Sequence, residues 1–145
     1  MPDVRFVLSI LKVQRLFESP ETFKGELSLN EIDKMTKNMG DTLLNVNFTG
    51  GEPFARKDIL EIAKLYIKNT SIQSIYITTN GSLPDRVKSF AEEIAKHNSE
   101  IEINFQISID DLPEQHNAVR KIKNLFDDCI KTYRMIKNLK NPNIN

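Results

Sequence analysis

Small and polar residues that could bind a ligand follow three short apolar runs of this 145-residue chain. In parallel α/β folds, ligands bind at the carboxyl ends of the strands, so these positions are the first candidates for a site. Glycines there let a ligand approach the backbone, and an adjacent carboxylate can pair with a cationic group. The three segments together predict a polar small-molecule site, although each alone is also typical of a turn or helix cap. They are Thr49-Gly50-Gly51-Glu52-Pro53, Thr79-Asn80-Gly81 and Ser108-Ile109-Asp110-Asp111.

The elements that would position this site follow from hydrophobic periodicity. Four β-branched or aromatic runs alternate with helical patterns, which predicts the order β-α-β-α-β-α-β-α. Because the runs look continuously apolar, we expect a parallel sheet buried on both faces. The runs are residues 4–10, 43–48, 72–78 and 101–109, and the helices should begin near Ser28, Asp58, Ser82 and Asn124.

The signals at the helix ends support these limits. Ser28-Leu29-Asn30-Glu31 reads as a capping box, and Gly40 is placed to end the first helix. Asp58 also has a glutamate three residues later, so the same kind of start is expected for the second helix.

Length limits the architecture. A full eight-fold barrel needs ~250 residues, so residues 1–145 predict one α/β domain, a (β/α)4 half-barrel resembling part of a TIM barrel. The alternative is an open, doubly wound three-layer α/β sheet. The last residues, Asn141-Pro142-Asn143-Ile144-Asn145, look like a turn into a fifth strand. We therefore expect a fragment of a longer chain.

Composition excludes several classes of partner. Twenty basic and twenty acidic residues give no net charge, which argues against nucleic acid. No apolar run approaches the ~20 residues of a membrane span, and no signal peptide is evident. The chain has a single cysteine, so a reduced, cytoplasmic setting is expected.

The three segments resemble, in order and spacing, those of radical S-adenosylmethionine (SAM) enzymes. Asn47-Phe48-Thr49-Gly50-Gly51-Glu52-Pro53 resembles the Gly-Gly-Glu-Pro segment that follows the family's second strand. Asn80-Gly81 resembles its Thr-Asn-Gly, and Ser108-Ile109-Asp110 with His116-Asn117-Ala118-Val119-Arg120 is similar to its Ser-x-Asp and His-Asp-x-x-Arg.

The resemblance implies a set of SAM-binding residues. Gly50, Gly51, Glu52 and Pro53 would form the main segment, with the first three meeting the methionyl amino group. Asn80 would line the same rim. Ser108 and Arg120 would lie near the ribose and carboxylate, because a guanidinium suits a bidentate carboxylate contact.

The resemblance fails at the metal site. The family's reaction begins at a 4Fe-4S cluster that is held by Cys-x-x-x-Cys-x-x-Cys, and here Ser9, Val13 and Leu16 stand at those positions. Valine and leucine have no donor atom, and a serine hydroxyl is a poor ligand for iron–sulfur. We therefore expect a radical SAM oxidoreductase or maturase fold without catalytic residues or a metal site, so that the chain is inactive although SAM could still bind.

A second hypothesis is a non-catalytic scaffold or interaction module without a ligand. The open edges and concave face of a half-barrel would favour a homo-oligomer. The other candidate residues have ordinary interpretations. His97 should lie at a helix end, His116 on an exposed loop, and Cys129 on the inward face of the last helix.

Overall fold

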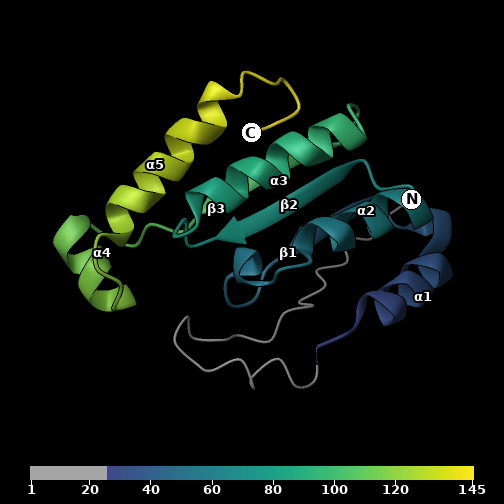
Figure 1. The fold of residues 1–145 in the computed structure, drawn as a ribbon, viewed down its shortest axis with the longest axis horizontal. Coiled ribbons are helices and arrows are strands. Elements are labelled where there is room, and N and C mark those ends of the chain that lie inside the picture. The colour runs from purple at the N-terminus through teal and green to yellow at the C-terminus, as the bar shows by residue number, and fades with distance from the viewer. Residues whose placement is uncertain (1–25) are drawn as a thin grey trace.

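The computed structural model describes residues 26–145 (Figure 1). The predicted first strand, residues 4–10, and the positions Ser9, Val13 and Leu16 lie outside the described residues. The longest helices of the described part have 14 residues each, and no helix there is long and apolar enough to cross a bilayer. In chain order the elements are α1 (Leu29–Met39), a 3-10 turn (Gly40–Thr42), β1 (Asn45–Phe48), a 3-10 turn (Pro53–Ala55), α2 (Ile59–Asn69), β2 (Ser74–Thr79), α3 (Pro84–His97), β3 (Glu102–Ile107), α4 (Pro113–Arg120) and α5 (Leu125–Asn138).

The three strands form a parallel sheet in the order β1-β2-β3. Val46 aligns with Ile75, which in turn aligns with Ile103. Beyond β3, Ile144 forms an isolated parallel bridge to Ile103, and the Asn145 N–H donates to the Ile103 carbonyl at 2.8 Å. The extended segment that was predicted after the last helix therefore pairs with the free edge of β3.

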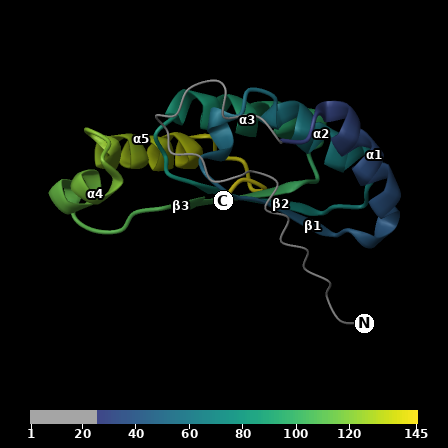
Figure 2. The same cartoon turned by 90° about the horizontal axis from the view of Figure 1, so that it is seen from below.

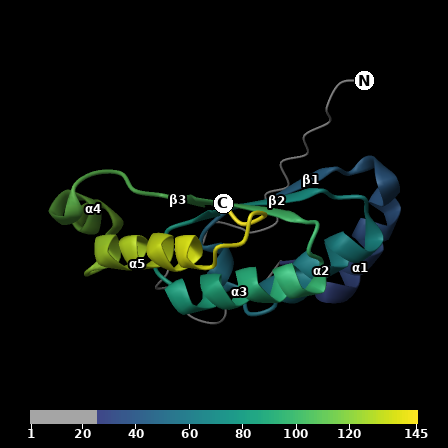
Figure 3. The same cartoon turned by 90° about the horizontal axis from the view of Figure 1, so that it is seen from above.

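The covering helices lie on one face of the sheet (Figures 2 and 3). Within the described residues this is the arrangement of a barrel wall, and it confirms the α/β class and a partial half-barrel. A doubly wound three-layer sheet would place helices on both faces.

The expectation of apolar burial on both faces is wrong. Burial alternates along β1, with Val46 and Phe48 buried and the two asparagines of the strand half-buried. On the face away from the helices, Asn47, Tyr76 and Asn104 share one cross-strand row, and Tyr76 is 45% exposed. The period of two places polar residues within each run on this second face.

The starts of the first two helices agree with the sequence, α3 begins at Pro84 with Leu83 rather than Ser82 as its N-cap, and α4 (Pro113–Arg120) is a helix that the sequence analysis does not predict. The Ser28 hydroxyl accepts from the Glu31 N–H at 3.3 Å, and Glu31 Oε2 accepts from the Ser28 N–H at 2.8 Å, which completes the predicted capping box. The second helix begins after Asp58 as predicted. The Asp58 carboxylate does not cap it, however, because it pairs with the Arg56 guanidinium at 2.7 Å.

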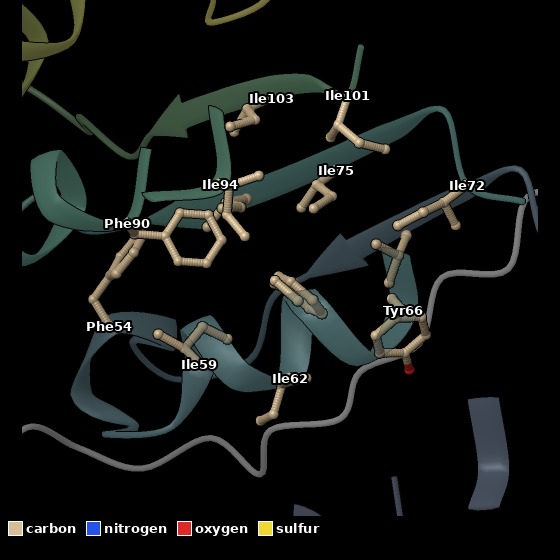
Figure 4. Packing of buried hydrophobic residues seen from close by; sticks show 14 of the residues in the cluster. Phe54, Ile59, Ile62, Tyr66, Ile72, Ile75, Phe90, Ile94, Ile101 and Ile103 are labelled. Carbon is tan, nitrogen blue, oxygen red and sulfur yellow. The ribbon is translucent and has the colours of Figure 1, made fainter. Parts of the chain in front are cut away.

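The core lies between the helix-covered face of the sheet and helices α2 and α3 (Figure 4). Phe54, from the turn after β1, packs edge-on against Phe90 of α3 with ring centroids 5.5 Å apart. This contact anchors the middle of the β1–α2 loop in the core. The isoleucines of this core include Ile59, Ile62, Ile75, Ile77, Ile94 and Ile103.

Tyr66 of α2 is fully buried, and its hydroxyl has no hydrogen-bond partner among the residues that the structure describes. Its ring meets Phe48 edge-on at 5.8 Å. Burial raises the pKa of Tyr66 to about 12. The ring therefore contributes packing, while the hydroxyl is desolvated without compensation.

We predict that Tyr66→Phe leaves the protein equally stable or stabilises it by about 1 kcal/mol, because the ring contact stays and the unpartnered hydroxyl goes. Chemical denaturation of the two proteins measures the difference in unfolding free energy. A Phe48→Leu control, which loses the ring contact, should be clearly less stable than wild type. A loss of stability in Tyr66→Phe similar to that of the control would contradict the prediction.

Candidate functional site

Because the three strands are parallel neighbours, the loops after β1, β2 and β3 all lie at the carboxyl end of the sheet. We call the residues of these loops, 49–53, 79–82 and 108–111, the rim. The Ser108 N–H donates to the Thr79 carbonyl at 2.9 Å, which joins the ends of β2 and β3. The three predicted segments therefore lie together.

Glu52 joins the first two rim loops. Its side chain turns inward, with the residue only 6% exposed, and Oε1 accepts from the Thr79 hydroxyl at 2.8 Å. Oε1 also accepts from the Phe54 N–H at 3.1 Å, and Oε2 accepts from the Asn80 N–H at 2.7 Å. One buried carboxylate thus accepts hydrogen bonds both from the loop after β1 and from the end of β2.

This arrangement has two consequences for the predicted ammonium contact of Glu52. Burial raises the pKa of its carboxyl, and the three donors partly oppose that rise. A carboxylate has about four acceptor sites, so three internal donors leave little capacity for a ligand. Glu52 acts in the structure first as a brace of the rim.

The glycine segment turns sharply before Glu52. Gly50 has φ 133°, a backbone conformation that side chains disfavour. Pro53 is buried and begins the 3-10 turn, and Glu52 caps that turn through the Phe54 N–H. Gly50 and Gly51 are half-buried at the rim.

The second rim loop lies directly under α5. Gly81 has φ 74°, and a Cβ built there would lie 3.0 Å from the Cys129 Cα and 3.2 Å from Ile107 Cγ2. The Thr132 hydroxyl donates to the Gly81 carbonyl at 2.9 Å. A side chain at this position would have to displace α5 by a few tenths of an ångström and adopt a strained backbone, so glycine is the residue that suits this approach. The Asn80 side chain accepts from the Ser82 N–H at 2.8 Å, which fixes the turn.

Arg120, the predicted carboxylate ligand, lies at the end of α4 and faces the third rim loop. Its Nε and Nη2 donate to the two carboxylate oxygens of Asp110 at 2.5 and 2.8 Å. The Arg120 guanidinium holds the pKa of Asp110 below its usual range. The Arg120 guanidinium is therefore already paired with Asp110 at the rim. Ser108, on the same loop as Asp110, is half-buried.

Two further residues contact the rim loops, and the sequence analysis does not assign them there. His116 was expected on an exposed loop, which is wrong: it is fully buried on α4. Cys129 is buried on α5 as predicted, and its Sγ lies 3.8 Å from His116 Nε2. His97 is exposed at the end of α3, as predicted. The signal for α4 was Pro113, a residue that favours the first turn of a helix.

No group of three His, Cys, Asp or Glu side chains within residues 26–145 is arranged to hold a metal ion. Burial raises the pKa of the Cys129 thiol to about 11, so the thiol stays protonated at neutral pH.

We predict that Glu52→Gln destabilises the protein by about 1–3 kcal/mol at neutral pH, because an amide NH2 would replace at least one of the acceptors that face three donors. Thermal and denaturant unfolding measure the change. Glu61→Gln, an exposed change on α2, is the charge-matched control and should have little effect.

The same pair of proteins tests the raised pKa of Glu52. A raised pKa means that the folded state holds this proton more tightly than the unfolded state. The stabilisation that comes from this tighter proton binding is therefore complete below the pKa that Glu52 has in the unfolded chain. It falls as the pH rises through the pKa that Glu52 has in the folded protein. The stability difference between wild type and Glu52→Gln should widen as the pH is lowered from 7 toward 4. A difference that narrows would contradict the direction of the shift.

Gly81→Ala should destabilise the protein by about 2–4 kcal/mol, because it adds overlap with the α5 backbone to the cost of a positive φ. Gly40→Ala is a comparison without overlap, since Gly40 has φ 53° and ψ −145° but nothing lies within 4 Å of the position that a Cβ would take there. Unfolding free energies of both variants are measured by denaturation. A loss at Gly81 no larger than the roughly 1–2 kcal/mol cost of a left-handed backbone would show that α5 does not press on the rim.

Comparison with known proteins agrees with this geometry. The sequence profile described as the Radical SAM superfamily matches residues 16–145. The chain is 32% identical over 114 residues to an Fe-coproporphyrin III synthase of Methanosarcina barkeri, a match that covers 75% of this chain and 26% of that protein. It is 44% identical over 63 residues to a GTP 3',8-cyclase of Cronobacter sakazakii, which covers 41% of this chain and 18% of the relative.

A GTP 3',8-cyclase of Alkaliphilus metalliredigens is 33% identical over 103 residues, with 70% of this chain and 30% of the relative covered. The matches thus span about a quarter of the length of these relatives. The family profile covers nearly all of the sequence, including every rim segment, and the chain therefore belongs to the radical SAM superfamily.

Proposed function

We propose that this chain supplies a SAM-binding rim of a radical SAM protein. The observation that carries the proposal is the Glu52–Asn80 link, in which a buried carboxylate joins the glycine segment after β1 to the loop after β2 at 2.7 Å. This link presents the backbone of both loops at the carboxyl ends of the strands, where ligands of such sheets bind.

The groups at the rim suit the polar parts of SAM. The carbonyl groups of Gly50 and Gly51 would accept from the methionyl ammonium, together with the remaining acceptor capacity of Glu52. Arg120 has five N–H donors, of which Asp110 engages those on Nε and Nη2, so the guanidinium can also donate to the methionyl carboxylate. Asn80 and Ser108 would contact the ribose side of the ligand.

A 4Fe-4S cluster does not fit the residues of this chain. Cluster ligation requires several thiolates, and the sequence has one cysteine, which is buried under the rim and protonated. The family profile begins at residue 16, so Ser9 and Val13 precede the matched segment. We therefore propose that these residues bind SAM without supplying the electron that cleaves it, and we derive no cleavage step.

The relatives bear the names of two different activities, a GTP cyclase and an Fe-coproporphyrin III synthase. Our proposal is therefore confined to SAM, the compound common to the superfamily, in a cytoplasmic protein. The second hypothesis, a scaffold that self-associates and binds no ligand, makes the opposite prediction for SAM titration.

We predict weak but measurable SAM binding by the full chain in isothermal titration calorimetry. Arg120→Gln should weaken it at least about tenfold, because a charge-assisted hydrogen bond contributes about 1.5–3 kcal/mol. Lys96→Gln, which removes an equal charge from the exposed end of α3, is the matched control and should bind like wild type.

Two results would contradict parts of this proposal. A Kd of about 1 mM corresponds to a binding free energy of about −4.1 kcal/mol. If SAM at a few times that concentration gives no heat of binding, the scaffold hypothesis is favoured. Stoichiometric iron after anaerobic reconstitution with iron and sulfide would show that the chain does hold a cluster. Light scattering on the same samples reports whether the chain self-associates.

A further inference from the structure

A continuous series of polar contacts runs beneath the rim from the loop after β3 to the loop after β2. The Asp110 N–H donates to His116 Nδ1 at 3.3 Å. His116 Nε2 lies 3.8 Å from Cys129 Sγ, and the Cys129 thiol donates to the Asn80 carbonyl at 3.0 Å. These groups come from two rim loops and from helices α4 and α5.

The geometry selects one tautomer of His116. Because a backbone N–H is directed at Nδ1, that nitrogen must carry the lone pair and Nε2 must carry the proton. The Asp110 carboxylate does not support the opposite tautomer, since its Oδ2 lies 3.7 Å from Nδ1, beyond a hydrogen bond. Nε2–H then faces the Cys129 sulfur, which in turn uses its own proton toward Asn80.

All donors therefore point in one direction, from Asp110 through His116 and Cys129 to Asn80. The thiol is suited to this middle place because a protonated sulfur is both a weak donor and a weak acceptor. Its raised pKa agrees with a thiol that remains protonated.

We propose that His116 and Cys129 are positioning residues for the SAM site. They transmit the placement of the third rim loop to Asn80 and so set the spacing of the groups that would bind SAM. This inference rests on the proposed function for its effect on SAM, while the directed series of hydrogen bonds stands on its own geometry.

Asn80 is bonded both to Glu52 and to Cys129. Its N–H donates to Glu52 at 2.7 Å and its carbonyl accepts from Cys129, so the peptide groups before and after Asn80 are both held. At the other end of the series, the Asp110 N–H donates to His116 Nδ1, and the Asp110 carboxylate accepts two hydrogen bonds from the Arg120 guanidinium. Loss of the middle of the series would free Asn80 and the Asp110–Arg120 pair to move independently.

The first test is the tautomer itself. Long-range 1H–15N correlation spectra of the full chain, labelled on histidine, distinguish a protonated Nε2 from a protonated Nδ1. We expect His116 to show the Nε2–H tautomer, because its Nδ1 accepts from the Asp110 N–H, and the exposed His97 at the end of α3 serves as the internal control. An Nδ1–H tautomer of His116, or an average of its two tautomers, would overturn the inference.

The second test compares Cys129→Ser with Cys129→Ala by SAM calorimetry. Serine retains a donor and an acceptor at this position and alanine retains neither, so we expect Cys129→Ala to weaken SAM binding by about three- to tenfold more than Cys129→Ser. Serine would not rescue a role in packing alone, because both variants remove the large, apolar sulfur atom.

The outcomes separate this inference from the proposed function. SAM binding by wild type with equal affinities of the two variants would overturn the positioning role and leave the proposed function intact. Absence of SAM binding by wild type would overturn the proposed function, and the effect on SAM with it, while the NMR spectra still decide the hydrogen-bond series. If Cys129→Ala fails to fold, His116→Asn, which keeps an acceptor near the Nδ1 position but loses the contact with Cys129, takes its place and should show the same weakening.

Discussion

The rim depends on a carboxylate that has been removed from water. A buried carboxylate is costly unless hydrogen-bond donors surround it, and the Phe54 and Asn80 N–H groups and the Thr79 hydroxyl offset part of that cost for Glu52. Satisfying the charge therefore fixes the backbone of two loops at once. Phe54, which follows directly, packs against Phe90 and ties this loop to the core. Burial of one side chain thus contributes to the position of the first two rim loops.

The C-terminal helices α4 and α5 hold the second and third rim loops in place. Helix α5 lies close enough to the second rim loop that glycine is the residue that suits position 81, and Thr132 and Cys129 both donate to carbonyl groups of that loop. Helix α4 places His116 behind the third loop. Residues 52, 81, 116 and 129 are far apart in the chain, yet they support one edge of the sheet. The helices after β3 therefore serve the site as well as covering the sheet.

Much of the scaffold could be predicted from local signals, because such signals act within a few residues. The capping box at Ser28, the end at Gly40 and the start of α5 after Asn124 all depend on neighbours along the chain. The rim segments were also found, since glycines and polar residues directly after apolar runs mark strand ends. Polar residues within the runs, such as Asn47 and Asn104, were overlooked, although their period of two already indicated a sheet with one polar face.

The remaining features depend on contacts between distant residues. The sequence could not show that the Glu52 carboxylate turns inward toward Asn80, because the choice between an internal donor and a ligand is made by the tertiary fold. Asp58 was expected to cap α2 and instead meets Arg56, a competition between two local partners. His116 was misplaced because α4 is short and largely polar, so its burial depends on packing against Phe126 of α5.

Amide hydrogen exchange at Asn80 tests the central claim most directly, because its N–H is the donor that links the two loops through Glu52. We expect this amide to exchange slowly in the ligand-free protein, at a rate close to that of the β2 core amides, and Glu52→Gln to accelerate it selectively. Exchange at the rate of an exposed loop amide in wild type would show that the rim is not held in place, and would contradict this claim.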